Sequence, residues 1–143
     1  MKSTKNIVFD SYAILAYAQD DSGADKVEQY LASAEEHKCK AFINRINLGE
    51  VYYIMIRKLG PDAAKNYLDS FSLLPAHIIE PTSSIILLAA EIKANHAISY
   101  ADCFVAATAL EYKASIITGD PEFKNMLTYL AKVHSYQPTF AYS

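Results

Sequence analysis

Two kinds of apolar pattern alternate along this chain, short compact runs and longer amphipathic segments. Ile7–Phe9 and Ser115–Thr118 are short runs without alternation, which is typical of strands that are covered on both faces. Lys40–Ile43 and Ala76–Ile79 are weaker strand candidates, and Ala131–Ser135 is a last weak one. The pattern predicts these five segments as strands.

The longer segments carry apolar residues at helical spacing. In one of them, Ala24, Val27 and Leu31 fall on one stripe while charged residues face away. Helices are predicted from Tyr12 onward and over Asp21–His37, Asn44–Leu59, Asp62–Leu74, Thr82–His96 and Ser99–Lys113. Alternating strands and helices predict right-handed crossovers and a mostly parallel sheet. We therefore expect one α/β domain over residues 1–143, a three-layer α/β/α arrangement with helices on both faces.

Composition agrees with a single globular domain, since 52% of the 143 residues are hydrophobic. The net charge of −3 argues against a generic basic nucleic-acid binder, but it allows an enzyme whose acids surround a metal ion. Cys39 and Cys103 lack metal-ligand spacing, which favours reduced, buried thiols. The N-terminus does not resemble a signal peptide, and no apolar stretch reaches the roughly 18 residues of a membrane span. We expect a cytoplasmic protein without membrane contact.

The segment Ile85–Ala90 is apolar nearly all round the predicted helix. A helix of this kind is either deeply buried or part of a contact between subunits. The segment therefore suggests a homodimer as one of two interpretations.

Four acids are isolated by the apolar pattern around them. Asp10 follows the run Ile7–Phe9, and Asp120 follows the second convincing strand. Glu50 and Asp102 lie near the starts of otherwise apolar helices. Because helices that follow parallel strands start at the carboxyl edge of the sheet, all four side chains can converge there.

Each acid also has a structural interpretation. Asp10 is suited to cap the helix that starts at Tyr12, and Asp120 with Pro121 forms a natural turn. Ser99-x-x-Asp102 and Asn47-x-x-Glu50 both match the spacing of a capping box. Four like charges at one sheet edge are harder to explain in this way, because packed carboxylates repel one another.

A divalent cation relieves that repulsion. Hard oxygen ligands suit Mg²⁺ or Mn²⁺, which are held through a few carboxylates and several waters. The chemistry that becomes available is phosphodiester hydrolysis, because a metal ion polarises the phosphate and activates water.

Other candidate residues are weaker. The histidines are scattered without metal spacing, at positions 37, 77, 96 and 134, and we interpret them as structural or surface residues. Ser11 has no evident histidine base, and no phosphate-binding glycine loop is present. Most of the eleven tyrosines suit the core or an interface, although one or two near the site could stack on bases. Arg45, Lys93 and Lys124 are either phosphate contacts or solvated surface residues.

Four segments taken together resemble a known family. They are IVFDSYAILAY, INLGEVYYIM, SYADCFVAATAL and IITGDPEF, and in this order they resemble a PIN domain, most closely the VapC-type ribonuclease toxin of toxin–antitoxin pairs. The resemblance covers residues 7 to about 135. It implies a parallel sheet between helices and an acidic Mg²⁺ site.

The resemblance also assigns site residues. The acids of the family match Asp10, Glu50, Asp102 and Asp120, and its small hydroxyl residues match Ser11 and Thr118. Asp10, Asp102 and Asp120 are then expected to hold the metal, and Glu50 to bind it or to orient the attacking water. Ser11 and Thr118 would steady the carboxylates or a bound water.

The resemblance further implies cleavage of single-stranded or looped RNA, a homodimer, and a cognate antitoxin that covers the site. One departure is that Pro121 follows the last aspartate directly, which leaves Glu122 as the nearest further acid. The sequence therefore predicts a Mg²⁺- or Mn²⁺-dependent endoribonuclease, the toxin of such a pair.

Two alternatives stay open. One is a catalytically silent PIN-fold module that binds RNA or protein. The other is a phosphatase or phosphoacceptor domain with Asp10 as nucleophile, although Tyr12 stands where the usual DxDxT motif has its second acid.

Overall fold

A computed structural model describes residues 5–120, 123 and 126 of the chain. The strands are β1 (Lys5–Phe9), β2 (Cys39–Asn44), β3 (His77–Ile79) and β4 (Ser115–Ile117). The helices are α1 (Ser11–Ala18), α2 (Ala24–Glu35), α3 (Arg45–Leu59), α4 (Pro61–Phe71), α5 (Ser83–Asn95) and α6 (Tyr100–Tyr112). These elements confirm the order predicted from the sequence, with ends shifted by up to three residues. The strand predicted at Ala131–Ser135 lies outside the described residues.

The described strands form one parallel sheet in the order β3-β2-β1-β4. Ile7 of β1 is paired with Ala41 of β2 on one side and with Ser115 of β4 on the other. The chain thus builds outward from β1 to β3 and then returns through α5 and α6 to the opposite side of β1. This reversal makes the gap between the carboxyl ends of β1 and β4 a topological switch point, where α/β sheets bind ligands.

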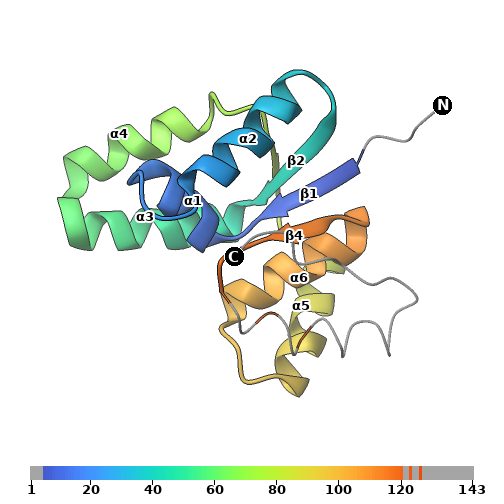
Figure 1. The fold of residues 1–143 in the computed structure, drawn as a ribbon. Coiled ribbons are helices and arrows are strands. Elements are labelled where there is room, and N and C mark those ends of the chain that lie inside the picture. Colours follow the sequence, from blue (N-terminus) through green and yellow to red (C-terminus); the bar gives the residue numbers. More distant parts are fainter. Residues whose placement is uncertain (1–4, 121–122, 124–125, 127–143) are drawn as a thin grey trace.

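Helices cover both faces of the sheet, as Figure 1 shows. Ile7, Phe9 and Ile43 pack with α1, α2, α3 and α4 in one core cluster. Val8 and Phe42 point to the other face and pack with α5 and α6 in a second cluster. The alternation along β1 follows from the two-residue period of a strand. The three-layer α/β/α arrangement is therefore confirmed.

Polar side chains start four of the helices. Asp10 Oδ1 accepts the Ala13 N–H of α1 at 2.7 Å, and Asn44 Oδ1 accepts the Ile46 N–H of α3 at 2.9 Å. Thr82 and Ser99 cap α5 and α6 in the same way. Such caps satisfy N–H groups that have no partner inside the helix.

The capping-box interpretation of Asn47 is wrong, because α3 already begins at Arg45 behind its cap Asn44. Asn47 lies inside the helix and is fully buried. A buried amide within a helix has to find partners elsewhere in the fold, and the partners of its Nδ2 lie at the candidate site.

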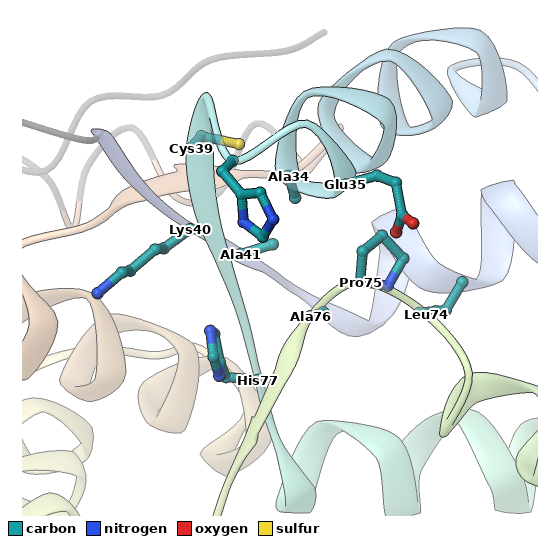
Figure 2. Close-up of a pocket in the computed structure, with 10 residues that line it drawn as sticks. Ala34, Glu35, Cys39, Lys40, Ala41, Leu74, Pro75, Ala76 and His77 are labelled. Atoms are coloured by element: carbon teal, nitrogen blue, oxygen red, sulfur yellow. The ribbon is translucent and has the colours of Figure 1, made fainter.

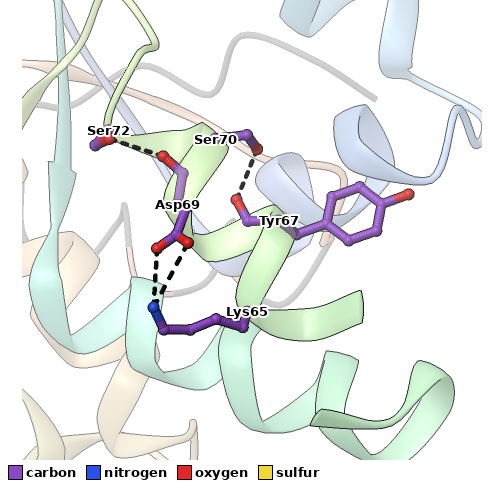
Figure 3. Close-up of polar contacts among 5 residues, drawn as sticks. All are labelled: Lys65, Tyr67, Asp69, Ser70 and Ser72. Carbon is purple, nitrogen blue, oxygen red and sulfur yellow. Dashed lines mark hydrogen bonds and ion pairs between the residues drawn. The ribbon is translucent and has the colours of Figure 1, made fainter. Parts of the chain in front are cut away.

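Side-chain hydrogen bonds lie on the exposed surface of α4 and at its end (Figure 3). Lys65 Nζ and Asp69 Oδ1 are 3.3 Å apart, one helical turn from each other. The hydroxyls of Ser70 and Ser72 donate to the carbonyl oxygens of Tyr67 and Asp69, each at 2.7 Å. The two hydroxyl groups thereby donate hydrogen bonds to carbonyl groups near the end of α4, just before the chain continues to β3.

The exposure of α5 disagrees with one of the two interpretations made for Ile85–Ala90, namely deep burial. Ile85 and Ala89 are buried, but Ile86 and Leu87 are 39% and 66% exposed. Deep burial of the whole segment is therefore wrong for this chain, and the contact between subunits stays a prediction. Within residues 5–120, no helix combines the length and the apolar character that a membrane crossing needs.

Both cysteines are buried and free of disulfides, as expected. Burial raises the pKa of the Cys103 thiol to about 11, so it stays protonated at neutral pH. Cys103 belongs to the core cluster beneath α5 and α6. The thiols are thus packing residues.

Candidate active site

The four acids singled out by the sequence line one cavity of about 200 Å³. Asp10 follows β1, and Asp120 lies three residues beyond β4. Glu50 comes from the second turn of α3 and Asp102 from the first turn of α6. The cavity lies at the switch point of the sheet, where the Asp10 N–H donates to the Ile117 carbonyl at 3.4 Å. The topology therefore brings together residues that lie as far as 110 positions apart.

Asp10 is the most enclosed of these acids, with 1% of its surface exposed. Its Oδ1 caps α1, while its Oδ2 accepts a short hydrogen bond from Thr118 Oγ1. The capping interpretation of Asp10 is thus confirmed, and the same carboxylate also lines the cavity at the sheet edge. Each oxygen keeps a further lone pair for a cation or a water.

The environment of Asp10 disfavours its negative charge. Burial is the main cause of its raised pKa, about 7 against an ordinary 3.8, and the charges of Asp102 and Asp120 act in the same direction. The hydrogen bonds from Thr118 and Ala13 lower the pKa in part. A cation in the cavity would stabilise the ionised carboxylate.

Thr118 connects two of the acids. Its hydroxyl donates to Asp10, and it accepts the Asp120 N–H at 3.0 Å. Thr118 is fully buried, so this arrangement is fixed by the core rather than by solvent. The position of Asp120 relative to Asp10 is set by this threonine.

Asn47 connects the helix starts around the cavity, and its role was missed in the sequence. Its amide Nδ2 donates to the Ala101 carbonyl of α6 at 3.0 Å and to Ser11 Oγ of α1 at 3.4 Å. The Ser11 hydroxyl in turn donates to the Asn47 carbonyl at 3.3 Å. One buried side chain thus connects α1, which Asp10 caps, with α3 and α6, which carry Glu50 and Asp102. The sequence offered one indication of this role, which is a polar residue at a helix position where the pattern otherwise places apolar residues.

The donor set of the cavity fits a hard divalent cation, since its lining contains four carboxylates together with the hydroxyls of Ser11 and Ser99. Among residues 5–120, 123 and 126, no group of three potential ligands is close enough to form a ready-made metal cluster. A Mg²⁺ ion usually keeps several waters and is bound through only one or two protein carboxylates, so it does not need such a cluster. Asp10, Asp102, Asp120 and Glu50 are the residues that could hold it.

Two other candidates from the sequence have partners outside the acid cavity. Arg45 forms an exposed ion pair with Glu80 at 2.6 Å, and Lys93 donates to the Ile98 carbonyl at 2.6 Å. Neither residue lines the acid cavity. Lys124, Glu122 and His134 lie outside the described residues.

His37 and His77 line a second cavity, at the amino end of β2 and β3, with a volume of about 580 Å³. Figure 2 shows Cys39 and Lys40 on β2, His77 on β3 and Glu35 at the end of α2. The lining mixes acidic, basic and thiol groups, and it includes no described metal cluster. Size alone therefore does not identify the site, because the smaller cavity holds the convergent acids.

Comparisons with known proteins bear on the fold and the family of the chain. Similar solved structures include VapBC from Salmonella typhimurium bound to DNA, at 14% identity and TM-score 0.70, with 97% of this chain and 98% of that chain covered. Mycobacterium tuberculosis VapC20, described as a toxin that cleaves the sarcin-ricin loop, has 17% identity and TM-score 0.67, with 84% and 94% covered. VapBC2 from Rickettsia felis bound to a promoter DNA fragment has 15% identity and TM-score 0.68, with 96% and 99% covered.

No curated protein matches the chain. At 14–17% identity, the solved structures establish the shared fold alone. The family assignment rests on the sequence match itself, which runs over residues 7–127 and includes all four acids. The chain therefore belongs to the PIN domain family.

Proposed function

We propose that this protein is a metal-dependent endoribonuclease, with Mg²⁺ or Mn²⁺ as cofactor, and that it acts as the toxin of a toxin–antitoxin pair. The observation that carries the proposal is the convergence of four acids on one cavity at the switch point of a PIN domain. When bound there, a divalent ion would polarise the scissile phosphate and lower the pKa of water.

The protein's own residues have distinct roles in this proposal. Asp10, Asp102 and Asp120 hold the cation and thereby bring the phosphate to the edge of the sheet. Glu50, on the wall formed by α3, binds the cation or accepts a proton from the attacking water. Thr118 keeps the Asp10 carboxylate in place through its hydrogen bond, and Ser11 supports the site through its hydrogen bonds with Asn47.

The test is degradation of a mixed RNA pool by purified wild type, Asp10→Asn and Asp62→Asn, with Mg²⁺, with Mn²⁺ and with EDTA. Asp62 is exposed in the first turn of α4, so its variant controls for the loss of one charge. We expect cleavage by wild type and Asp62→Asn only when metal is present, and none by Asp10→Asn. Cleavage by Asp10→Asn at the wild-type rate would refute the mechanism, and RNA binding without turnover would favour the silent module.

A homodimer is part of the proposal, and the exposed α5 residues Ile86 and Leu87 support it. Apolar side chains gathered on one helix face are typical of protein contacts. Light scattering at micromolar concentration should give a dimer mass for wild type and a monomer mass for Leu87→Lys. Leu73→Lys is the control, because Leu73 is 85% exposed and lies outside α5.

A cognate antitoxin is the second proposed partner. The similar structures from Rickettsia felis and Salmonella typhimurium are VapBC assemblies bound to DNA. For this chain, we expect a protein encoded beside it to form a stable complex and to suppress RNA cleavage. Cleavage that continues unchanged in the presence of such a complex would contradict this assignment.

A further inference from the structure

A third pocket lies beside α1 and adjoins the acid cavity. It has a volume of about 380 Å³, and its lining includes Tyr12, Leu15, Gln19, Asp21, Ser22 and Lys58. Tyr12 and Leu15 also line the acid cavity, so the two hollows share a wall. Its volume falls within the range of roughly 300–1,000 Å³ that is usual for small-ligand sites.

We infer that this pocket binds the ribonucleotide next to the scissile phosphate and so holds the RNA strand in place for cleavage. The inference rests on the proposed nuclease function, because it is the phosphodiester in the acid cavity that brings a neighbouring nucleotide to the shared wall. It adds a binding site that lies outside the four acids and their hydroxyl partners.

Tyr12 is the residue that joins the two hollows. It follows Ser11 directly in α1, and 52% of its surface is exposed. An aromatic ring exposed at such a boundary offers a face for stacking, which every base can use whatever its sequence. A base stacked on Tyr12 would belong to a nucleotide whose phosphate reaches the acids.

Lys58 supplies a positive charge, which is absent from the lining of the acid cavity. It lies in the last turn of α3, is exposed, and takes part in none of the ion pairs between described residues. The chain as a whole carries −3, so a polyanionic strand needs a local cation on its path. Lys58 is the cation of this pocket, and it suits the backbone phosphate of the bound nucleotide.

Gln19, Asp21 and Ser22 form the polar part of the lining. A carboxylate such as that of Asp21 can accept a hydrogen bond, and the 2′-hydroxyl of a ribose can donate one. An acceptor disfavours a phosphate on the Asp21 side of the pocket and favours a sugar there, which leaves the phosphate to Lys58. The combination of ring, cation and acceptor therefore matches a ribonucleotide better than an apolar peptide.

The experiment measures dissociation constants by fluorescence anisotropy, using labelled single-stranded RNA decamers of random sequence with Ca²⁺ in place of the cofactor. We expect Tyr12→Leu and Lys58→Met each to weaken binding by about fivefold or more, and Tyr12→Phe to retain it because the ring remains. Lys113→Met is the charge control, since Lys113 ends α6 away from its Asp102 end. Decamers of deoxyribose should bind wild type more weakly than RNA, and Asp21→Asn should reduce that difference.

The outcomes separate this site from the nuclease function. If wild type cleaves RNA while Tyr12→Leu and Lys58→Met bind as tightly as wild type, the pocket is not a nucleotide site, and a protein partner becomes its better occupant. If wild type does not bind the decamers at all, the inference is equally overturned. If the variants weaken binding but wild type fails to cleave with any metal, the nuclease proposal fails and the nucleotide site stands.

Discussion

The two ends of the sheet carry cavities of opposite character. The cavity at the carboxyl end measures about 200 Å³ and gathers four acids, whereas the one at the amino end measures about 580 Å³ and mixes charges of both signs. Figure 2 shows this mixture, with Lys40 and Glu35 on opposite sides of β2. Like charges held together need an external partner, and mixed charges do not. In this protein, the chemistry of the residues that line a cavity therefore identifies a candidate site better than the volume of the cavity does.

The largest effect should come from removing single acids at the carboxyl end. Asp102→Asn and Asp120→Asn should each lower the rate of RNA cleavage by at least about 100-fold, because each removes a carboxylate that we propose to be a cation ligand. Glu35→Gln, at the amino end, should leave the rate unchanged. Initial rates on one RNA substrate with saturating Mg²⁺ measure the difference, and a similar loss in Glu35→Gln would erase the contrast between the two ends.

The second effect is on stability without metal. Asp10 has a pKa of about 7 in the folded protein against 3.8 unfolded, so the folded state binds the extra proton. Its contribution is fully present below pH 3.8 and is lost as pH rises through about 7. Asp10→Asn, which cannot ionise, should therefore be more stable than wild type at pH 8, by up to about 4 kcal/mol.

Urea unfolding in EDTA at several pH values between 5 and 8.5 checks this prediction. The advantage of Asp10→Asn should shrink as pH falls, and added Mg²⁺ should stabilise wild type more than the variant. Asp62→Asn serves as the control, because its free energy of unfolding should differ from that of wild type by the same amount at every pH. A variant that is less stable than wild type at pH 8 would show that Asp10 is not held in an unfavourable charged state.

Sequence reasoning found the acids because each follows or starts a recognisable element. Asp10 and Asp120 come after the two clearest strands, and the fold class follows from the alternation of strands and helices. The strand order was not predictable in the same way. It depends on the return of α5 and α6 across the sheet, and short apolar runs do not specify which strands become neighbours.

Side-chain partners across the fold were also beyond the sequence. Asn47 matched a capping box by spacing, but it instead donates to Ala101 and Ser11, which are 54 and 36 positions away. Spacing along one segment describes local hydrogen bonds only. Likewise, the hydroxyl at Thr118 was assigned from the family, whereas its bond to Asp10 could be described only from the structure.

A third, smaller effect concerns Asn47, which ties together the helix starts at the carboxyl end. Asn47→Ala should lower the free energy of unfolding by about 1–3 kcal/mol, because the Ala101 carbonyl loses its buried donor. It should also lower kcat, since Ser11 and Asp102 lose their common support. Asn66→Ala, on the exposed side of α4, is the matched control. Unchanged kcat in a well-folded Asn47→Ala would limit Asn47 to a packing role.

The smallest effect is expected at the amino end. His77 is exposed there and contacts the Phe42 ring at 5.5 Å between centroids. His77→Ala should change stability by about 0.5 kcal/mol or less, as exposed substitutions usually do. RNA cleavage and its dependence on metal should stay at wild-type values, and a loss of either would make this cavity part of the site.

The most direct test of the central claim is Mn²⁺ binding measured by isothermal titration calorimetry, which does not depend on activity. We predict that wild type and Glu35→Gln bind Mn²⁺ alike, and that Asp10→Asn, Asp102→Asn and Asp120→Asn each bind it at least about tenfold more weakly. Binding that survives unchanged in all three aspartate variants, or that falls equally in Glu35→Gln, would contradict a cation site at the carboxyl end of the sheet.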